Sequence, residues 1–242
     1  MIYFIKFIFA LILVCFASIG NAANSNVKTT IGIGYFHSEG EYKNSDTLTL
    51  NSLPVFIRLQ NGLTSFKVSS ILSRYERTGR ATSKKIDQEG LGNSYVSVKQ
   101  LFKAPVLIHY LDVEGKIKTP TADTTDGLGT AGYDFKLSTT AYYKISKNWL
   151  TASIAYQWRD NELRSTFSTA LGLSHTFSKM FSGGVILDYE EATQNISDDT
   201  LESVIHVTWK AHKKTKYSFY MIKGFKDLKL DWASGLQASY HW

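Results

Sequence analysis

The last seven residues, Leu236-Gln237-Ala238-Ser239-Tyr240-His241-Trp242, alternate between apolar and polar side chains and finish on an aromatic residue. Successive side chains of a β-strand point to opposite faces, so the apolar members of this segment share one face. The pattern is typical of the final strand of a bacterial outer-membrane β-barrel, whose outward face meets lipid. We therefore expect the segment to close a transmembrane barrel, and we expect Trp242 to be recognised by the barrel assembly machinery.

Residues 1–23 have the features of a secretory signal peptide. Lys6 precedes the apolar run Phe7 to Ile19, which leads to the small-residue site Gly20-Asn21-Ala22-Ala23. A retained membrane anchor is the alternative, but the run is short for a span. The single cysteine, Cys15, follows Val14, whereas a lipoprotein site needs a small residue there. We expect a signal peptide at 1–23 and a barrel domain at 24–242 that lacks cysteine, which excludes disulfides and thiol catalysis.

Composition limits what the rest of the chain can be. Lys and Arg number 27 against 21 Asp and Glu, a mild excess that is spread along the sequence. No basic cluster interleaved with aromatic residues stands out, so nothing supports nucleic-acid binding. After the signal, no apolar stretch is long enough for a membrane helix. Any insertion into a membrane must therefore be by strands.

About twelve segments show the period-two alternation of β-strands. Between Tyr133 and Tyr143, for example, Phe135 and Leu137 share one face, while Asp134 and Lys136 share the other. One face suits lipid and the other suits water, which predicts an all-β, antiparallel, up-and-down transmembrane barrel. The predicted strands are 27–36, 48–59, 63–75, 94–102, 106–118, 133–145, 149–159, 166–177, 181–190, 201–211, 217–225 and 232–242.

The connections between these segments alternate in length. A soluble β-sandwich can have alternating strands too, but short turns at one end and long loops at the other are expected of a barrel inserted with its turns in the periplasm. An even strand number then puts both termini at the short-turn end. We expect the outer membrane of a Gram-negative cell as the location and its lipid as a partner. The short connections are Asn61-Gly62, Lys103-Ala104, Ser146-Lys147-Asn148, Ser178-Lys179 and His212 to Thr215, and the long ones are Thr78 to Gly92 and Thr119 to Gly132.

Aromatic residues make up 14% of the chain and bunch near the predicted strand ends, among them Trp149, Trp158 and Trp232. Such bunching is typical of the two aromatic girdles of a membrane barrel. Ordinary strand propensity is the alternative for any single aromatic residue. The bunching favours girdles at two membrane interfaces.

The polar face of the strands carries charges of both signs. In a barrel this face lines the lumen, where charged side chains can select and orient a polar or anionic solute. The alternative is that the charges pair with one another and fill a narrow interior, which twelve strands would allow. The side chains that we expect in the lumen are Arg58, Lys67, Lys99, Asp112, Glu114, Lys116, Asp134, Lys136, Lys144, Arg159, Asp188, Glu190, Glu202, His206 and Lys210.

A more specific motif spans the fifth predicted strand and its loop. It reads Asp112-Val113-Glu114-Gly115-Lys116-Ile117-Lys118-Thr119-Pro120-Thr121-Ala122-Asp123 and continues as Gly127-Leu128-Gly129-Thr130-Ala131-Gly132-Tyr133-Asp134. With Gly90-Leu91-Gly92-Asn93-Ser94-Tyr95, it resembles the bacterial outer-membrane transporter family of the meta-pathway of phenol degradation. The family's pattern is Gly-Leu-Gly-Asp at the start of an earlier strand, then Gly-Lys-apolar-Lys at the end of a strand, followed by Pro-Thr-Gly-Asp and Leu-Gly-Thr-Gly. The resemblance implies an outer-membrane barrel with a transport role and carries over no functional residues. The chain departs from the pattern at Asn93, Thr119, Ala122 and Ala131.

The loop from Thr119 to Gly132 is a candidate constriction. Pro120 fixes its backbone angle φ, and Gly127, Gly129 and Gly132 permit turns that other residues avoid, so the loop can fold back over the pore. An ordinary surface loop is the alternative. Asp123 belongs to the same loop, but the spacing of its acidic residues lacks a calcium-binding pattern. We expect no metal here.

Three functions are compatible with such a barrel. The first is an outer-membrane channel for a small solute, and the second is a structural or host-surface barrel with a closed lumen and binding loops. The third is a lipid hydrolase, for which a serine and a histidine would have to pair. Ser174 and His175 are sequence neighbours and point to opposite faces, and no Gly-x-Ser-x-Gly motif occurs. We expect a channel, no enzymatic activity and no cofactor.

Overall fold

The structure is a computed structural model that describes residues 27–42, 46–78, 85–104, 108–122, 128–160, 163–194, 199–225 and 231–242. The predicted signal peptide lies outside the described residues, as do Asp123 and Gly127. No helix among the described residues is long and apolar enough to cross a membrane. The described strands are β1 (Val27–Tyr42), β2 (Asp46–Asn61), β3 (Thr64–Thr78), β4 (Lys85–Leu91), β5 (Ser94–Lys103), β6 (Tyr110–Thr119), β7 (Asp134–Ile145), β8 (Asn148–Arg159), β9 (Thr166–Thr176), β10 (Phe181–Glu190), β11 (Thr200–His212), β12 (Thr215–Gly224) and β13 (Trp232–His241).

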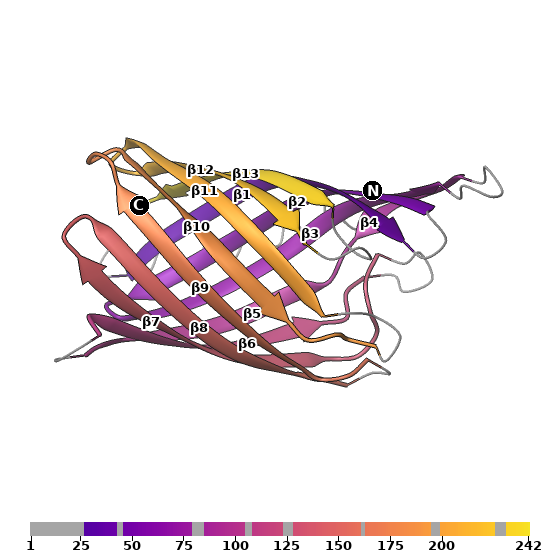
Figure 1. Ribbon diagram of the computed structural model, residues 1–242, viewed down its shortest axis with the longest axis horizontal. Helices are drawn as coiled ribbons and strands as arrows, with labels where there is room; N and C mark the ends of the chain where they lie inside the picture. Colours follow the sequence, from indigo (N-terminus) through magenta and orange to yellow (C-terminus); the bar gives the residue numbers. More distant parts are fainter. Residues whose placement is uncertain are drawn as a thin grey trace.

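The strands form one closed antiparallel sheet (Figure 1). Every neighbour in the ring follows in sequence order, and the β1–β13 and β2–β3 pairings complete the circle. At the β1–β13 seam, Thr29 and Trp242 exchange backbone hydrogen bonds of 3.3 and 3.1 Å. Closure leaves no edge in the ring, so its backbone groups are paired within the wall. The predicted up-and-down barrel of twelve strands is confirmed. The start of β1 and the end of β13 both lie at the short-turn end.

The structure contains one strand, β4, that the sequence did not predict. The connection predicted between Thr78 and Gly92 contains β4, which pairs with β3 and continues into β5. On β3, Ser69 pairs with Tyr95 of β5 and Leu72 pairs with Leu91 of β4. Three steps along one strand therefore match four along the other, which is a β-bulge at Gly92-Asn93. β4 and β5 together form one bulged wall strand.

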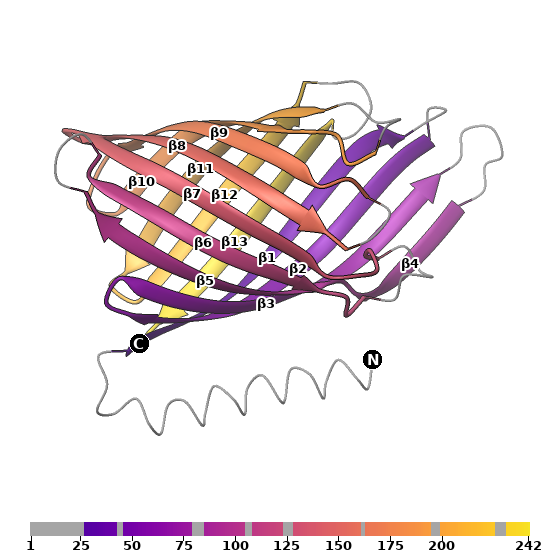
Figure 2. The same ribbon diagram turned by 90° about the horizontal axis from the view of Figure 1, so that it is seen from below.

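The first strands are longer than predicted. β1 continues to Tyr42 rather than ending at Phe36, and it pairs with β2 as far as Tyr42 and Asp46. The sheet of β1, β2, β3 and β4 projects beyond the rest of the rim at the long-loop end (Figure 2). Its added residues are mostly polar or charged, so they lack the apolar alternation from which membrane-crossing strands were predicted.

The two faces of the wall differ sharply in chemistry. Large apolar side chains are exposed on the outside, such as Leu171 (65% exposed) and Ile205 (58% exposed). Among the described residues, the only buried hydrophobic ones are Phe56, Ala155 and Ala233, so no apolar core stands inside. A folded protein with its apolar surface outside and polar residues inside is suited to lipid rather than to water.

Outward-facing aromatic side chains gather near both ends of the barrel. Near the short turns, Trp209 stacks between Phe181 and Tyr217, with ring centres 6.1 and 5.5 Å apart. At the long-loop end, Trp158 packs on Phe135 at 5.3 Å and on a neighbouring tyrosine. These groups match the predicted girdles. Trp149 differs, because it lines an interior cavity of the barrel.

Candidate functional site: the lumen of the barrel

The alternation along the strands puts the polar side chains inside the barrel. Their neighbours in sequence, such as Phe135, Leu137 and Leu187, are exposed on the outside. Directly paired residues share a face, so the register between strands carries this placement from one strand to the next. The side chains placed on the lumen side in this way include Arg58, Lys67, Lys99, Asp112, Glu114, Lys116, Asp134, Lys136, Lys144, Arg159, Asp188, Glu190, Glu202, His206 and Lys210.

An ion-pair network lies near the long-loop end of the lumen. Asp134 accepts from Lys118 Nζ at 3.1 Å and from Arg159 Nη1 at 3.4 Å, and Arg159 Nη2 reaches Glu190 at 3.2 Å. Gln157 also donates to Asp134, at 3.0 Å. Lys118 and Asp134 are buried, so each charge depends on its partners. The network, here called the upper network, ties β6, β7, β8 and β10 together.

Lys118 was missed by the sequence prediction. It has the same parity as Glu114 and Lys116 on β6, and Tyr95 of β5 is its direct partner. The alternation along β6 therefore indicates a lumen position for Lys118, which the sequence analysis uses only in the Gly-Lys-apolar-Lys motif. Lys216 on β12 was missed for another reason: the strand was predicted to begin one residue later, at Tyr217.

A second network lies nearer the short turns. Asp112 accepts from Lys99 Nζ at 3.2 Å and from the hydroxyl of Tyr142 at 2.6 Å. Lys99 also contacts Glu114 at 3.4 Å. Three elements, β5, β6 and β7, supply these four residues, here called the lower network. Its charges are paired with one another.

A row of cations runs between the two networks. Arg58 pairs directly with Lys67 across β2 and β3, and Lys116 pairs directly with Lys136 across β6 and β7. Ser97 of β5 is the direct partner of both Lys67 and Lys116, so the row is continuous. Within the part of the chain that the structure describes, none of the four cations forms an ion pair. We call these four residues the basic row.

Aromatic rings hold three members of the basic row. Lys67 Nζ lies 4.8 Å and Arg58 Cζ lies 5.8 Å from the centre of the Phe56 ring, and Lys116 Nζ lies 4.2 Å from the centre of the Tyr95 ring. The Phe56 ring fits because it covers Gly32 on β1, where any side chain would collide with it. The rings orient the cations without neutralising them.

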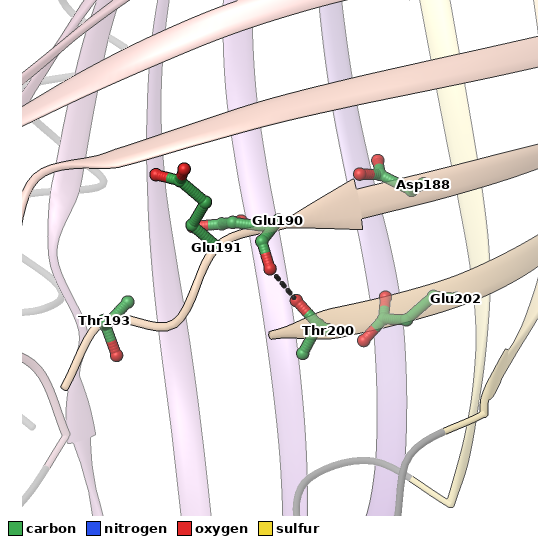
Figure 3. Close-up of a pocket in the computed structure, with 6 residues that line it drawn as sticks. All are labelled: Asp188, Glu190, Glu191, Thr193, Thr200 and Glu202. Carbon is green, nitrogen blue, oxygen red and sulfur yellow. Dashed lines mark hydrogen bonds between the residues drawn. The ribbon is translucent and has the colours of Figure 1, made fainter. Parts of the chain in front are cut away.

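Acidic side chains gather on the opposite side of the ring of strands. Asp188 and Glu202 pair directly across β10 and β11, and Glu190 and Glu191 lie beside them. Together with Thr193 and Thr200 they line a cavity of about 260 Å³ (Figure 3). No group of three or more metal-ligating side chains is arranged to hold a metal ion among the described residues. The basic row and this acidic group therefore lie on opposite sides of the ring of strands.

The described parts of the predicted constriction loop fold back onto the bulge. Lys118 donates to Thr130, with distances of 2.5 Å to Oγ1 and 3.4 Å to the carbonyl oxygen, and Thr121 donates to the Gly92 carbonyl at 3.0 Å. Pro120 opens the loop, and Gly132 closes it with a positive φ of 77°. A side chain at Gly129 would collide with Ala122 and Asn93. The loop is thus fastened to the upper network through Lys118.

His206 and Lys210 belong to a separate part of the lumen near the short turns. They line a cavity of about 480 Å³ together with Tyr142, Trp149 and Ser174. Ser174 and His175 both border this cavity, but His175 bonds to Asn148 at 2.6 Å and packs against an aromatic ring. Among the described residues, no serine hydroxyl is hydrogen-bonded to a histidine.

No family model matches the chain, and no curated protein matches it either. Among solved structures, the fold is similar to the COG4313 outer membrane channel from Pseudomonas putida F1, with a TM-score of 0.76 at 13% identity over 89% of this chain and 95% of that chain.

It is also similar to the translocator domain of autotransporter NalP from Neisseria meningitidis, with a TM-score of 0.57 at 11% identity over 93% and 92% of the two chains. A KdgM porin in complex with disordered oligogalacturonate gives a TM-score of 0.51 at 11% identity over 87% and 98%. The barrel therefore resembles outer-membrane proteins in fold.

Proposed function

We propose that this protein is a passive channel of the Gram-negative outer membrane that lets a small polar solute cross. The observation that carries the proposal is the inversion of the wall: exposed apolar residues outside, charged and hydroxyl side chains inside. A closed barrel with this chemistry satisfies its backbone in lipid and keeps a polar path within. The similarity in fold to an outer-membrane channel and to a porin supports the same function.

The proposed orientation puts the short turns in the periplasm and the long loops outside the cell. Barrels of this class insert with short periplasmic turns. The two aromatic groups, around Trp209 and around Trp158, would then lie at the two lipid interfaces, with outer-membrane lipid between them. The finer assignment, to the transporter family of the phenol meta-pathway, rests on the motif around Gly115 and the loop that follows it.

A barrel with a closed lumen is the second candidate, and the upper network favours it. Arg159 joins Asp134 to Glu190, and the loop at Thr130 is fastened beside them. These contacts occupy the long-loop mouth of the lumen. A protein of this kind would act through its projecting β1–β4 sheet and loops instead of passing a solute.

Single-channel recording in planar bilayers separates the two candidates. Folded protein is first identified by its heat-modifiable migration in electrophoresis. A channel gives discrete conductance steps above the bare bilayer, and Gln157→Trp, which places a large ring beside Asp134, lowers them. Phe135→Leu, one strand away on the outer face, leaves the steps unchanged. Folded protein without conductance would reject the channel and favour the closed barrel.

A further inference from the structure

The basic row places like charges in directly paired positions, and this is costly for a sheet. Arg58 faces Lys67 and Lys116 faces Lys136. Like charges directly opposite each other on one face are destabilising. Lys67 also lies within electrostatic range of both Arg58 and Lys116, so the repulsion extends along the row. A fold that keeps such a row needs something to offset it.

The protein offsets the charge of the row only in part. Glu114 lies within electrostatic range of Lys67 and Lys116, and Asp188 lies within range of Lys136, without an ion pair to any of the three. The carboxylate beside it, Glu114, is held by Lys99 at 3.4 Å in the lower network. The carboxylate on the other side, Asp134, is held by Lys118 and Arg159 in the upper network. The charges of the upper and lower networks are thus paired, whereas the basic row between them forms no ion pair among the described residues.

Space for a small ion lies next to the row. A cavity of about 260 Å³ is lined by Arg58, Lys67 and Lys99 and by polar side chains that include Ser97. One carboxylate, Glu114, also lines it and is paired with Lys99 at 3.4 Å. The guanidinium of Arg58 stays charged at any physiological pH and offers a planar pair of donors. The ammonium of Lys67 and the hydroxyl of Ser97 add further donors. These donors suit the oxygens of an anion.

We infer that the basic row is an anion site, and that the solute of this channel carries a carboxylate, sulfate or phosphate group. The inference rests on the proposed channel function and names its solute class. An anion that enters the lumen pairs with the cations of the row in place of protein carboxylates. It binds at this level only, because the charges of the upper and lower networks are already paired. The rings of Phe56 and Tyr95 keep the cations aimed while no anion is present.

Ion selectivity tests the inference. Reversal potentials under a KCl gradient should give wild-type protein a higher permeability for chloride than for potassium. The double variant Lys67→Gln/Lys116→Gln should lower that ratio. Each lysine removed should lower it about fivefold, which is the effect of one unit charge at about 4 Å from the passing ion in water. Lys67→Arg/Lys116→Arg should retain the ratio, as should Lys147→Gln in the β7–β8 turn. An unchanged ratio in the glutamine variant would overturn the inference.

A second readout does not depend on conduction. Thermal unfolding is followed by heat-modifiable migration in phosphate and in chloride at equal ionic strength. Phosphate should raise the unfolding temperature of wild-type protein and of the arginine variant, and not that of the glutamine variant. Without phosphate, the glutamine variant should be the more stable protein, because the repulsion in the row is relieved. A less stable glutamine variant would mean that the lysines are structural, and would overturn the inference.

The two proposals fail in different ways. Conductance without anion preference keeps the channel and rejects the anion site. Absent conductance, together with phosphate stabilisation that is lost in the glutamine variant, keeps the anion site and rejects the channel.

Discussion

Lys118 on β6 and Asp134 on β7 are directly paired across the strands, and their charged atoms lie 3.1 Å apart at 5% and 4% side-chain exposure. Among the described residues, they form the most enclosed ion pair of the lumen. Because Arg159 shares the same carboxylate, one acid holds two cations. The stability of the long-loop end therefore depends on Asp134 more than on any other member of the upper network.

Asp134→Asn should destabilise the barrel strongly. Removing one partner from a buried ion pair leaves the other charge uncompensated, which costs about 3 kcal/mol or more. The free energy of unfolding, measured by urea titration in lipid vesicles, checks this. Asp231→Asn is the matched control, because Asp231 is exposed and its change should be near zero. Equal values for the two variants would show that the upper network does not stabilise the fold.

Leu171→Lys should reveal the lipid-facing side of the wall. Leu171 lies in the middle of β9 and is 65% exposed, so a lysine there would meet hydrocarbon and cost about 2 to 4 kcal/mol. Its neighbour Ala170 pairs with Asp188 on the lumen side, so Ala170→Lys should be tolerated. Unfolding in lipid vesicles gives both values. A larger loss for Ala170→Lys would reverse the assignment of the two faces.

Gly129→Ala should loosen the loop from the bulge. A methyl group at Gly129 would stand 2.8 Å from Asn93 Nδ2 and would also collide with Ala122, so the loop has to move. Overpacking of this kind costs about 1 to 3 kcal/mol. Hydrogen exchange at 128–132 should become faster. Gly115→Ala is the control, since its nearest neighbour would be Phe135 at 3.8 Å. Unaltered exchange in the Gly129 variant would mean that the loop is held elsewhere.

Trp242→Ala should lower the amount of barrel that reaches the outer membrane of cells. The proposed reason is recognition of the last aromatic residue by the assembly machinery. The backbone bonds between Trp242 and Thr29 remain in this variant, so refolding of purified protein into detergent should be nearly unchanged. Trp158→Ala, at the other end of the wall, should leave cellular assembly intact. Equal losses in cells for both variants would point to a general effect of losing a girdle residue.

The alternation of side chains predicted the ring, its closure and the lumen side of the wall, because a period of two is imposed by the strand itself. It did not predict the bulge at Gly92-Asn93, which adds a residue without changing the composition of the segment. The bunching of aromatic residues near the strand ends also predicted that Trp149 lies in a girdle. A residue at a strand end can face either way, and only the register with Lys144 puts this ring inside.

The pairing of charges inside the lumen could not be predicted from the sequence, and the reason is a different one. Which acid meets which base depends on the stagger between strands, and a shift of one residue would exchange partners throughout. That Asp134 is shared by Lys118 and Arg159, while Lys116 faces Lys136, follows from register alone. The list of inward charges was available from the pattern, whereas their division into paired networks and an unpaired row was not.

The seam between β1 and β13 limits the order in which the sheet can form. Thr29 and Trp242, which close the ring, lie near opposite ends of the described chain, so their hydrogen bonds join residues far apart in the sequence. The ring can close only after the chain has been made as far as β13. Until then the sheet has two open edges, and open strand edges can pair with those of another copy of the chain.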